Sequence, residues 1–273
     1  MLDVPEAPGE ETLRSAYEVL SWRAYLVVVI ALFAASLAAW QSTIDQSISM
    51  RGMVMGLGQI GWLTQGDMGV IVFLGMWMTM MVAMMLPTIA PIVLAHLAVT
   101  TQRRRGIHTT LAFIAGYLVV WFAIGLVPLL AYKAIAQIEG EPGQPTWLAP
   151  LAGAILVLAG AYQFTRWKRI CLDHCQSPLA FVATHDFGGG TLGAVRAGAI
   201  HGALCLGCCW ALTAVLLAVG LMNLVWMVAI FAIFVVEKSW RHGLVVARVA
   251  GGFLIALGAA VVAYPSLLAT ISL

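Results

Sequence analysis

Two clusters of soft metal ligands lie in apolar parts of this chain. The first is a methionine cluster, GMWMTMMVAMMLPTIAP (75–91), and the second is a histidine and cysteine cluster, HGALCLGCCW (201–210). Helices that only face lipid are built from Leu, Ile, Val and Phe, so thiols and imidazoles at this depth indicate another role. Thioether, thiolate and imidazole ligands together favour Cu(I) first and zinc second. The residue types therefore predict metal handling within apolar helices.

The second cluster places four ligand-type residues on one helical face. They are His201, Cys205, Cys208 and Cys209, at positions i, i+4, i+7 and i+8. Gly198 and Gly202 form a small-xxx-small pair that allows a close approach by another helix. Two alternatives to a metal site are buried thiols that act as small apolar groups and a vicinal disulfide between Cys208 and Cys209. A metal site is the interpretation that uses all four residues.

The methionines form stripes on a helix that contains two prolines. Met80 and Met84 follow Met76 at intervals of four residues, and Met81 and Met85 form the adjacent stripe. Pro87 and Pro91 lack an N–H, so the carbonyls of Ala83 and Pro87 lose their helical donors and need another partner. We expect a bend near Pro87 and an ion or polar contact at these carbonyls. The alternative is that methionine fills irregular gaps between helices.

Two further groups have ligand character. CLDHC places Cys171, His174 and Cys175 together at i, i+3 and i+4, which suits three-coordinate Cu(I), or zinc with one more ligand. Its order is not the C-x-x-C-H of covalent haem attachment, and the alternative is an exposed, reduced cysteine pair without a special role. Glu237 could be a carboxylate ligand or a hydrogen-bond partner of an imidazole. The alternative is that the adjacent pair Glu237 and Lys238 is an interfacial anchor, with Lys238 reaching the membrane surface.

The elements that must position these residues are membrane helices. Of the 273 residues 62% are hydrophobic and only 10% are charged, and about 20 apolar residues span a bilayer. Seven segments qualify, at 22–40, 69–97, 109–135, 147–165, 197–220, 221–236 and 247–264. The predicted fold is an all-α, polytopic membrane helix bundle. Residues 1–21 are expected to form a cytoplasmic or interfacial segment, and residues 22–273 a single bundle.

The basic residues give this bundle an orientation. With seven spans, 12 of the 14 Lys and Arg residues fall on the side of the N-terminus and two, Arg51 and Lys133, on the other. Since basic loops stay in the cytoplasm, the N-terminus is predicted to be cytoplasmic and the protein to lie in a bacterial inner membrane. The net charge of +2 gives no indication of nucleic-acid binding. The cysteines of 205–209 and Met84 and Met85 are expected at one depth, with His201 and then CLDHC nearer the cytoplasm.

The motifs together resemble an uncharacterised bacterial family of predicted metal-binding integral membrane proteins. They are AMMLPTIAP (83–91), AGAYQFTRWKRICLDHCQSP (159–178), HGALCLGCCW (201–210), GLMNLVWM (220–227) and the EK at 237–238. The resemblance covers roughly residues 70–260. It implies a multi-pass protein with a metal site and adds no mechanism.

The residues favour copper handling, as a carrier or as a factor that delivers copper to a membrane or periplasmic metalloenzyme. The expected partners are the lipid bilayer and either a soluble metal carrier or such an enzyme. An enzyme remains an alternative, as a membrane thiol oxidoreductase or a subunit of a metal-dependent membrane oxygenase. A thiol oxidoreductase ordinarily has C-x-x-C on the oxidising side, whereas CLDHC has three intervening residues and lies on the reducing side. A structural subunit that packs through methionine and small residues is the third class.

Overall fold

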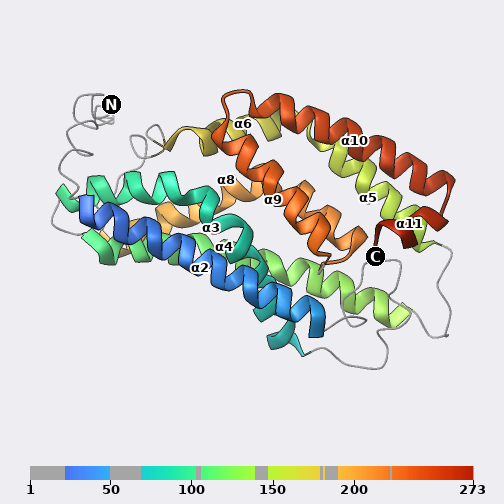
Figure 1. The fold of residues 1–273 in the computed structure, drawn as a ribbon, viewed down its shortest axis with the longest axis horizontal. Helices are drawn as coiled ribbons and strands as arrows, with labels where there is room; N and C mark the ends of the chain where they lie inside the picture. Colours follow the sequence, from blue (N-terminus) through green and yellow to red (C-terminus); the bar gives the residue numbers. More distant parts are fainter. Residues whose placement is uncertain are drawn as a thin grey trace, which may run out of the picture.

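A computed structural model describes residues 22–49, 69–102, 106–138, 147–178, 181, 190–221 and 223–272, and these form helices and no strand (Figure 1). The helices are α2 (Trp22–Ser49), α3 (Val70–Gln102), α4 (Gly106–Ile138), α5 (Leu148–Tyr162), α6 (Arg166–Gln176), α8 (Gly190–Val219), α9 (Leu224–Ser239), α10 (Gly243–Ala263) and α11 (Ser266–Ile271). The predicted all-α class is confirmed. The predicted segment 1–21 lies outside the described residues.

Each of the seven predicted segments lies on a helix. Five helices, α2, α3, α4, α8 and α10, are long and apolar enough to cross a membrane. The helices α5 and α6 pass the same test only as a pair, and they meet at a bend of 64°. The remaining helix, α9, has 16 residues, which is short of the roughly 20 that a bilayer core requires. The number of crossings and the orientation therefore stay predictions.

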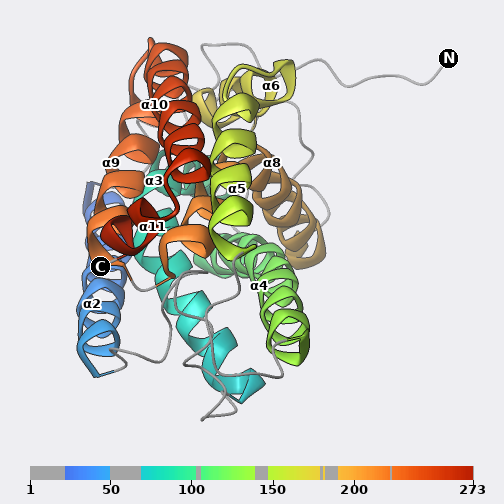
Figure 2. The ribbon, with the colours of Figure 1, turned by 90° about the vertical axis from the view of Figure 1, so that its right-hand side faces the viewer.

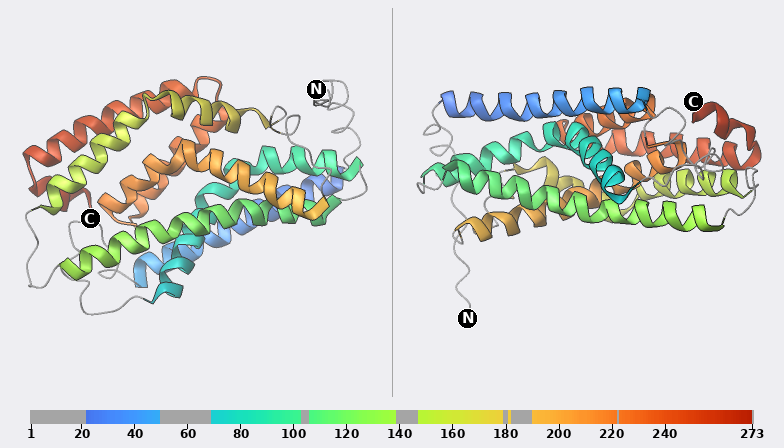
Figure 3. Two further views of the ribbon diagram at one scale, coloured as in Figure 1. Left: turned by 180° about the vertical axis from the view of Figure 1, so that it is seen from behind. Right: turned by 90° about the horizontal axis from the view of Figure 1, so that it is seen from below.

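The cysteine helix α8 lies at the centre of the helix contacts. It packs against α4, α5, α6 and α9, while α2 covers α3, and α3 packs against α4 and α9. The helices α5 and α10 run side by side (Figure 3), and α2 lies at the opposite side of the bundle from α8 (Figure 2). The residues on α8 can thus meet groups from several helices at once.

Glycines bring α4 and α8 into close contact. A Cβ added at Gly198 would clash with the carbonyl oxygen of Phe113, and one at Gly202 would lie 3.1 Å from the carbonyl oxygen of Tyr117. The close approach predicted for this glycine pair is confirmed, and the neighbouring helix is α4. Without these glycines, α8 could not sit close enough to bring its histidine and cysteine face against the aromatic residues of α4.

The methionine helix α3 is bent. One of the carbonyls that its prolines leave without a helical donor accepts a hydrogen bond from a neighbouring helix. Pro87 and Pro91 lie inside α3, and Figure 1 shows the helix changing direction along its length. The hydroxyl of Ser36, on α2, donates a hydrogen bond of 2.9 Å to the carbonyl of Ala83, which Pro87 leaves without its helical donor. At Ala83 the expected polar contact is therefore a side chain of a neighbouring helix.

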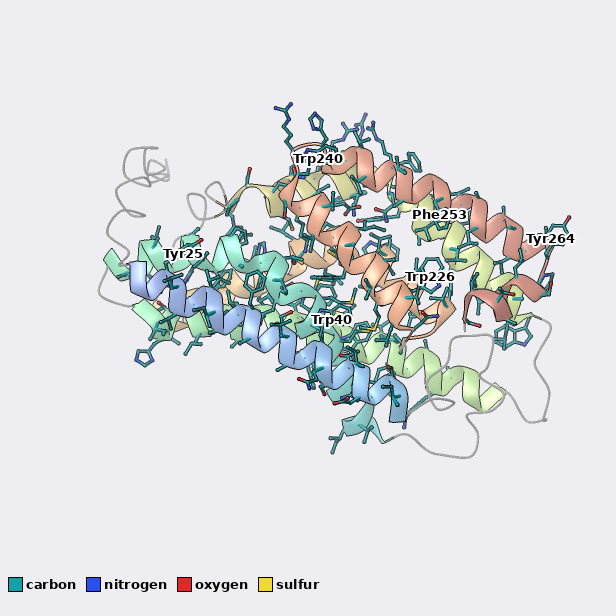
Figure 4. The ribbon with its side chains drawn as sticks, viewed as in Figure 1. Tyr25, Trp40, Trp226, Trp240, Phe253 and Tyr264 are labelled. Atoms are coloured by element: carbon teal, nitrogen blue, oxygen red, sulfur yellow. The ribbon has the colours of Figure 1, made fainter. Side chains whose placement is uncertain are left out.

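Aromatic side chains lie along the whole bundle. Figure 4 places Tyr25, in the first turn of α2, toward the left and Tyr264, just after α10, toward the right, with Trp40 and Trp240 near the middle. Trp40 and Trp240 close predicted spans on opposite sides, so these residues do not test the predicted orientation.

Candidate metal centre

Three buried cysteine sulfurs from two helices lie together. The Sγ atoms of Cys175 on α6 and of Cys205 and Cys208 on α8 are all within 4.8 Å of one another. Cys175 and Cys208 are 3.6 Å apart, and the Sγ of Cys209 lies 3.3 Å from that of Cys208. All five cysteines of the chain are free thiols. The group thus offers several soft ligands in one enclosed place.

The spacing of these sulfurs suits a metal ion. Metal–sulfur bonds of about 2.3 Å place two ligands of one ion about 3.8 Å apart in tetrahedral geometry and about 4.6 Å apart in linear geometry. The Cys175–Cys208 distance of 3.6 Å and the upper limit of 4.8 Å for all three pairs lie within about 0.2 Å of the ends of this range. Small side-chain movements are sufficient to bring two or three sulfurs onto an ion.

The helix α6 contributes Cys175 because of the periodicity of its buried face. Lys168, Leu172 and Cys175 are buried, at i, i+4 and i+7, whereas Trp167 is 71% exposed. The side chain of Thr165 caps the helix by accepting a hydrogen bond from the backbone N–H of Lys168. The 64° bend from α5 then lays this face against α8. An amphipathic helix therefore closes the cysteine group from one side.

The CLDHC residues do not stay together as predicted. Cys175 joins the cysteines of α8, so the expected separate level nearer the cytoplasm is wrong for this residue. Cys171 is half-buried and packs on Gly207, where an added Cβ would lie 2.5 Å from its Sγ. His174 is exposed, and its Nδ1 lies 2.8 Å from the carbonyl of Ile170. Residues three and four apart on a helix share a broad face, but only one side of that face meets α8.

His201 lies on the predicted face of α8, but among aromatic rings. Its ring is stacked 5.9 Å from that of Tyr117 and 6.2 Å from that of Phe113, and it meets the ring of Phe181 edge-on at 5.0 Å. Within the part of the chain that the structure describes, the group with metal-ligand spacing is formed by cysteines alone. His201 therefore packs among aromatic rings and is not one of the residues of the three-cysteine group.

Lys238 points into the cysteine group, so the alternative in which it is an interfacial anchor is wrong. Its Nζ lies 3.2 Å from the Sγ of Cys205 and 3.0 Å from the hydroxyl oxygen of Thr88 on α3. The hydroxyl of Tyr117 on α4 is also 3.2 Å from the Sγ of Cys205. An ammonium and a phenol thus surround one sulfur, and both favour negative charge on it.

A second lysine is buried on the other side of the group. Lys168 is paired with Glu237 at 2.7 Å, and its Nζ also donates to the carbonyl of Cys208 at 2.7 Å. Both side chains are at most 1% exposed. The other carboxylate oxygen of Glu237, Oε1, is buried without a hydrogen-bond partner among the described residues. Glu237 therefore reaches the cysteines through Lys168.

Sequence reasoning missed Lys168 because it counted this residue as a loop charge. The signal was available, since Lys168 precedes Cys175 by seven residues and so shares its helical face. Lys238 was counted in the same way. Both turn inward, and under the predicted seven-span topology the remaining basic residues still fall mainly on the side of the N-terminus.

The predicted methionines are buried in the same apolar core as the cysteines. Met80, Met81, Met84 and Met85 are each at most 1% exposed. Thr88 continues their stripe, four residues after Met84, and it is the residue through which α3 reaches Lys238 and thus Cys205. This register directs Met84 toward the cysteine side of α3.

The larger part of the sequence matches a family model. The model describes a copper chaperone family, PpoB2, and it covers residues 74–261, which is more than half of the chain. The chain belongs to this copper chaperone family. The matched region contains all the residues of the cysteine group, both lysines and the methionine stripe, and it agrees with the resemblance that the motifs indicated. No curated protein and no solved structure matches the chain.

Proposed function

We propose that the protein binds Cu(I) inside the membrane at Cys175, Cys205 and Cys208 and delivers it to a membrane or periplasmic metalloenzyme. The observation that carries this proposal is the approach of three buried sulfurs from α6 and α8 to within 4.8 Å, in a member of a copper chaperone family. A delivery protein must hold copper and then exchange it with a partner. A few thiolates on two different helices suit that task.

The ligand chemistry supports Cu(I). Thiolates and thioethers are soft ligands that select Cu(I), which is content with two or three of them. Structural zinc almost always takes four ligands, so zinc would need Cys209 as well as the three-cysteine group. Cys209 and Met84 are the nearest further candidates for copper, because Cys209 adjoins Cys208 and Met84 lies one turn before Thr88. Cys171, His174 and His201 would act outside the site itself.

Copper loading tests this proposal. The full chain, purified in detergent under reducing conditions, is expected to hold Cu(I) against a colorimetric chelator, and the Cys205→Ser/Cys208→Ser/Cys209→Ser variant is expected to lose it. The His174→Ala variant is the matched control, because His174 is an exposed ligand-type residue outside the group. Full copper retention by the triple variant would show that the intramembrane site is wrong.

We also propose that the chain crosses a bacterial inner membrane seven times with a cytoplasmic N-terminus. The apolar lengths of five helices and the bent pair α5–α6 support this placement. Reporter fusions after Leu97 and after Thr165 should both report a cytoplasmic location. An external location for either fusion would contradict the map.

A further inference from the structure

The two lysines at the cysteine group, Lys168, which is buried, and Lys238, which is half-buried, differ in their partners. Lys168 is paired with the carboxylate of Glu237, so this pair adds no net charge. The recorded contacts of Lys238 among the described residues are a hydroxyl, a sulfur and the ring of Phe234, whose centroid is 5.7 Å from Nζ. The region therefore carries one positive charge that the cysteines themselves must balance.

That positive charge is held in a fixed position. The hydroxyl of Thr88, from α3, and the Sγ of Cys205, from α8, lie on two different helices, and Lys238 bridges them from α9. The ring of Phe234, one turn earlier on α9, lies beside the ammonium. The ammonium thus stays beside one ligand sulfur instead of reaching for water.

The positive charge of Lys238 affects which metal ion the cysteines can hold. When two of the three cysteines bind Cu(I) as thiolates and the third stays a neutral thiol, the complex carries one net negative charge. A bare charge of this kind is costly to bury in a low-dielectric interior. An ammonium at the ligand sulfur cancels that charge. A divalent ion on the same two thiolates is neutral, so beside Lys238 it would leave the ammonium uncancelled.

We propose that Lys238 is the counter-charge that allows this site to bury a monovalent ion on two thiolates. This inference rests on the proposed binding of Cu(I) by the cysteines. Lys238 acts through Cys205 without contacting the ion, so it is a positioning residue. Its contribution makes the site selective for the charge of the cargo as well as for softness.

The test compares two soft ions that both bind two thiolates in linear geometry but differ by one charge, Cu(I) and Hg(II). The reduced full chain is titrated with each ion in competition with a chelator, as wild type, Lys238→Met and Lys238→Arg. We expect Lys238→Met to weaken Cu(I) binding about 10- to 100-fold, the usual cost of losing an outer partner of a metal ligand. Hg(II) binding should be unchanged or tighter, and Lys238→Arg, which keeps the charge, should keep most of the Cu(I) affinity.

Each outcome decides a different claim. If the wild type does not bind Cu(I), the proposed function fails. If the wild type binds Cu(I) and Lys238→Met binds it equally tightly, only the role of Lys238 is overturned. Equal losses of Cu(I) and Hg(II) in Lys238→Met would show a structural role and would also overturn it. If Lys238→Met does not fold, Lys238→Gln replaces it, because glutamine keeps a hydrogen-bond donor without the charge.

Discussion

The cysteine region and the methionine region of this bundle are both rich in sulfur, yet they are held together differently. Around the cysteines, Tyr117, Lys168 and Lys238 make polar contacts with a sulfur or with a cysteine carbonyl. Glu237 and Thr88 in turn contact the two lysines, so four helices take part. Around the methionines, the side-chain hydrogen bonds go to backbone carbonyls, as from Ser36 to Ala83, from Thr88 to Met85 and from Trp77 to Trp121. The remaining interactions there are apolar packing.

We infer from this difference that the cysteine region is the binding site and that the methionine region supports the packing of the helices. Charge inside a membrane protein is costly and is retained where it serves function, so the lysines mark the cysteine side as the site. Thioethers carry no charge and adapt their shape, so a stripe of them can fill the space beside a bent helix. Substitutions in the two regions should therefore differ in kind as well as in size.

The largest effect is expected from removing one partner of the buried ion pair. Glu237→Gln leaves the Lys168 ammonium buried without its counter-charge, which costs about 3–5 kcal/mol in the free energy of unfolding. Thermal unfolding of the purified chain measures this loss. Asp173→Asn, on the exposed side of α6, is the control and should change the free energy of unfolding by less than about 0.5 kcal/mol. Equal stability of the two variants would contradict the difference between the regions.

The next largest effect is the difference in Cu(I) affinity between the serine variants of the two cysteines of α6. Cys175→Ser should weaken Cu(I) binding by about 100-fold, because a sulfur of the three-cysteine group is lost and even outer partners of a ligand contribute about 10- to 100-fold. Cys171→Ser should weaken it only a few-fold, since Cys171 packs on Gly207 and is not one of the three grouped sulfurs. Chelator competition measures both affinities. A larger effect at Cys171 would move the site by one turn toward the start of α6.

A smaller effect is expected on the methionine helix. Met84→Leu nearly keeps the volume of the side chain, so the free energy of unfolding should change by less than about 1.5 kcal/mol. Cu(I) affinity should fall only mildly, as expected for an auxiliary ligand. A loss of Cu(I) binding at Met84 as large as that at Cys175 would give the two regions equal roles.

The smallest effect concerns the bend in α3. Ser36→Ala removes the donor to the carbonyl of Ala83 and should cost about 0.6 kcal/mol, the average for a hydrogen bond between membrane helices. Copper affinity should not change, because this bond lies in the supporting region. Ser47→Ala, whose hydroxyl bonds within its own helix, controls for the substitution itself. A change in copper affinity would link the bend to the site.

The helical architecture could be predicted because it depends on local sequence. Apolar runs long enough for a bilayer identify helices at all seven predicted places, and helical periodicity groups the cysteines of α8 on one face. The glycine pair at 198 and 202 also predicted a close helix contact, since only the absence of a side chain permits it. These inferences need no knowledge of which helices are neighbours.

The composition of the site depended on neighbours and could be predicted only in part. Periodicity alone cannot tell which edge of α6 meets α8, so Cys171, His174 and Cys175 looked equivalent until packing selected Cys175. In the same way, a lysine at a helix end can reach for the membrane surface or turn inward, and only the approach of Thr88 and Cys205 explains why Lys238 turns inward. The sequence by itself determined which residues could bind copper, through their softness and helical spacing. The tertiary structure decided which of them meet and which charges balance them, because those depend on distances between helices far apart in the chain.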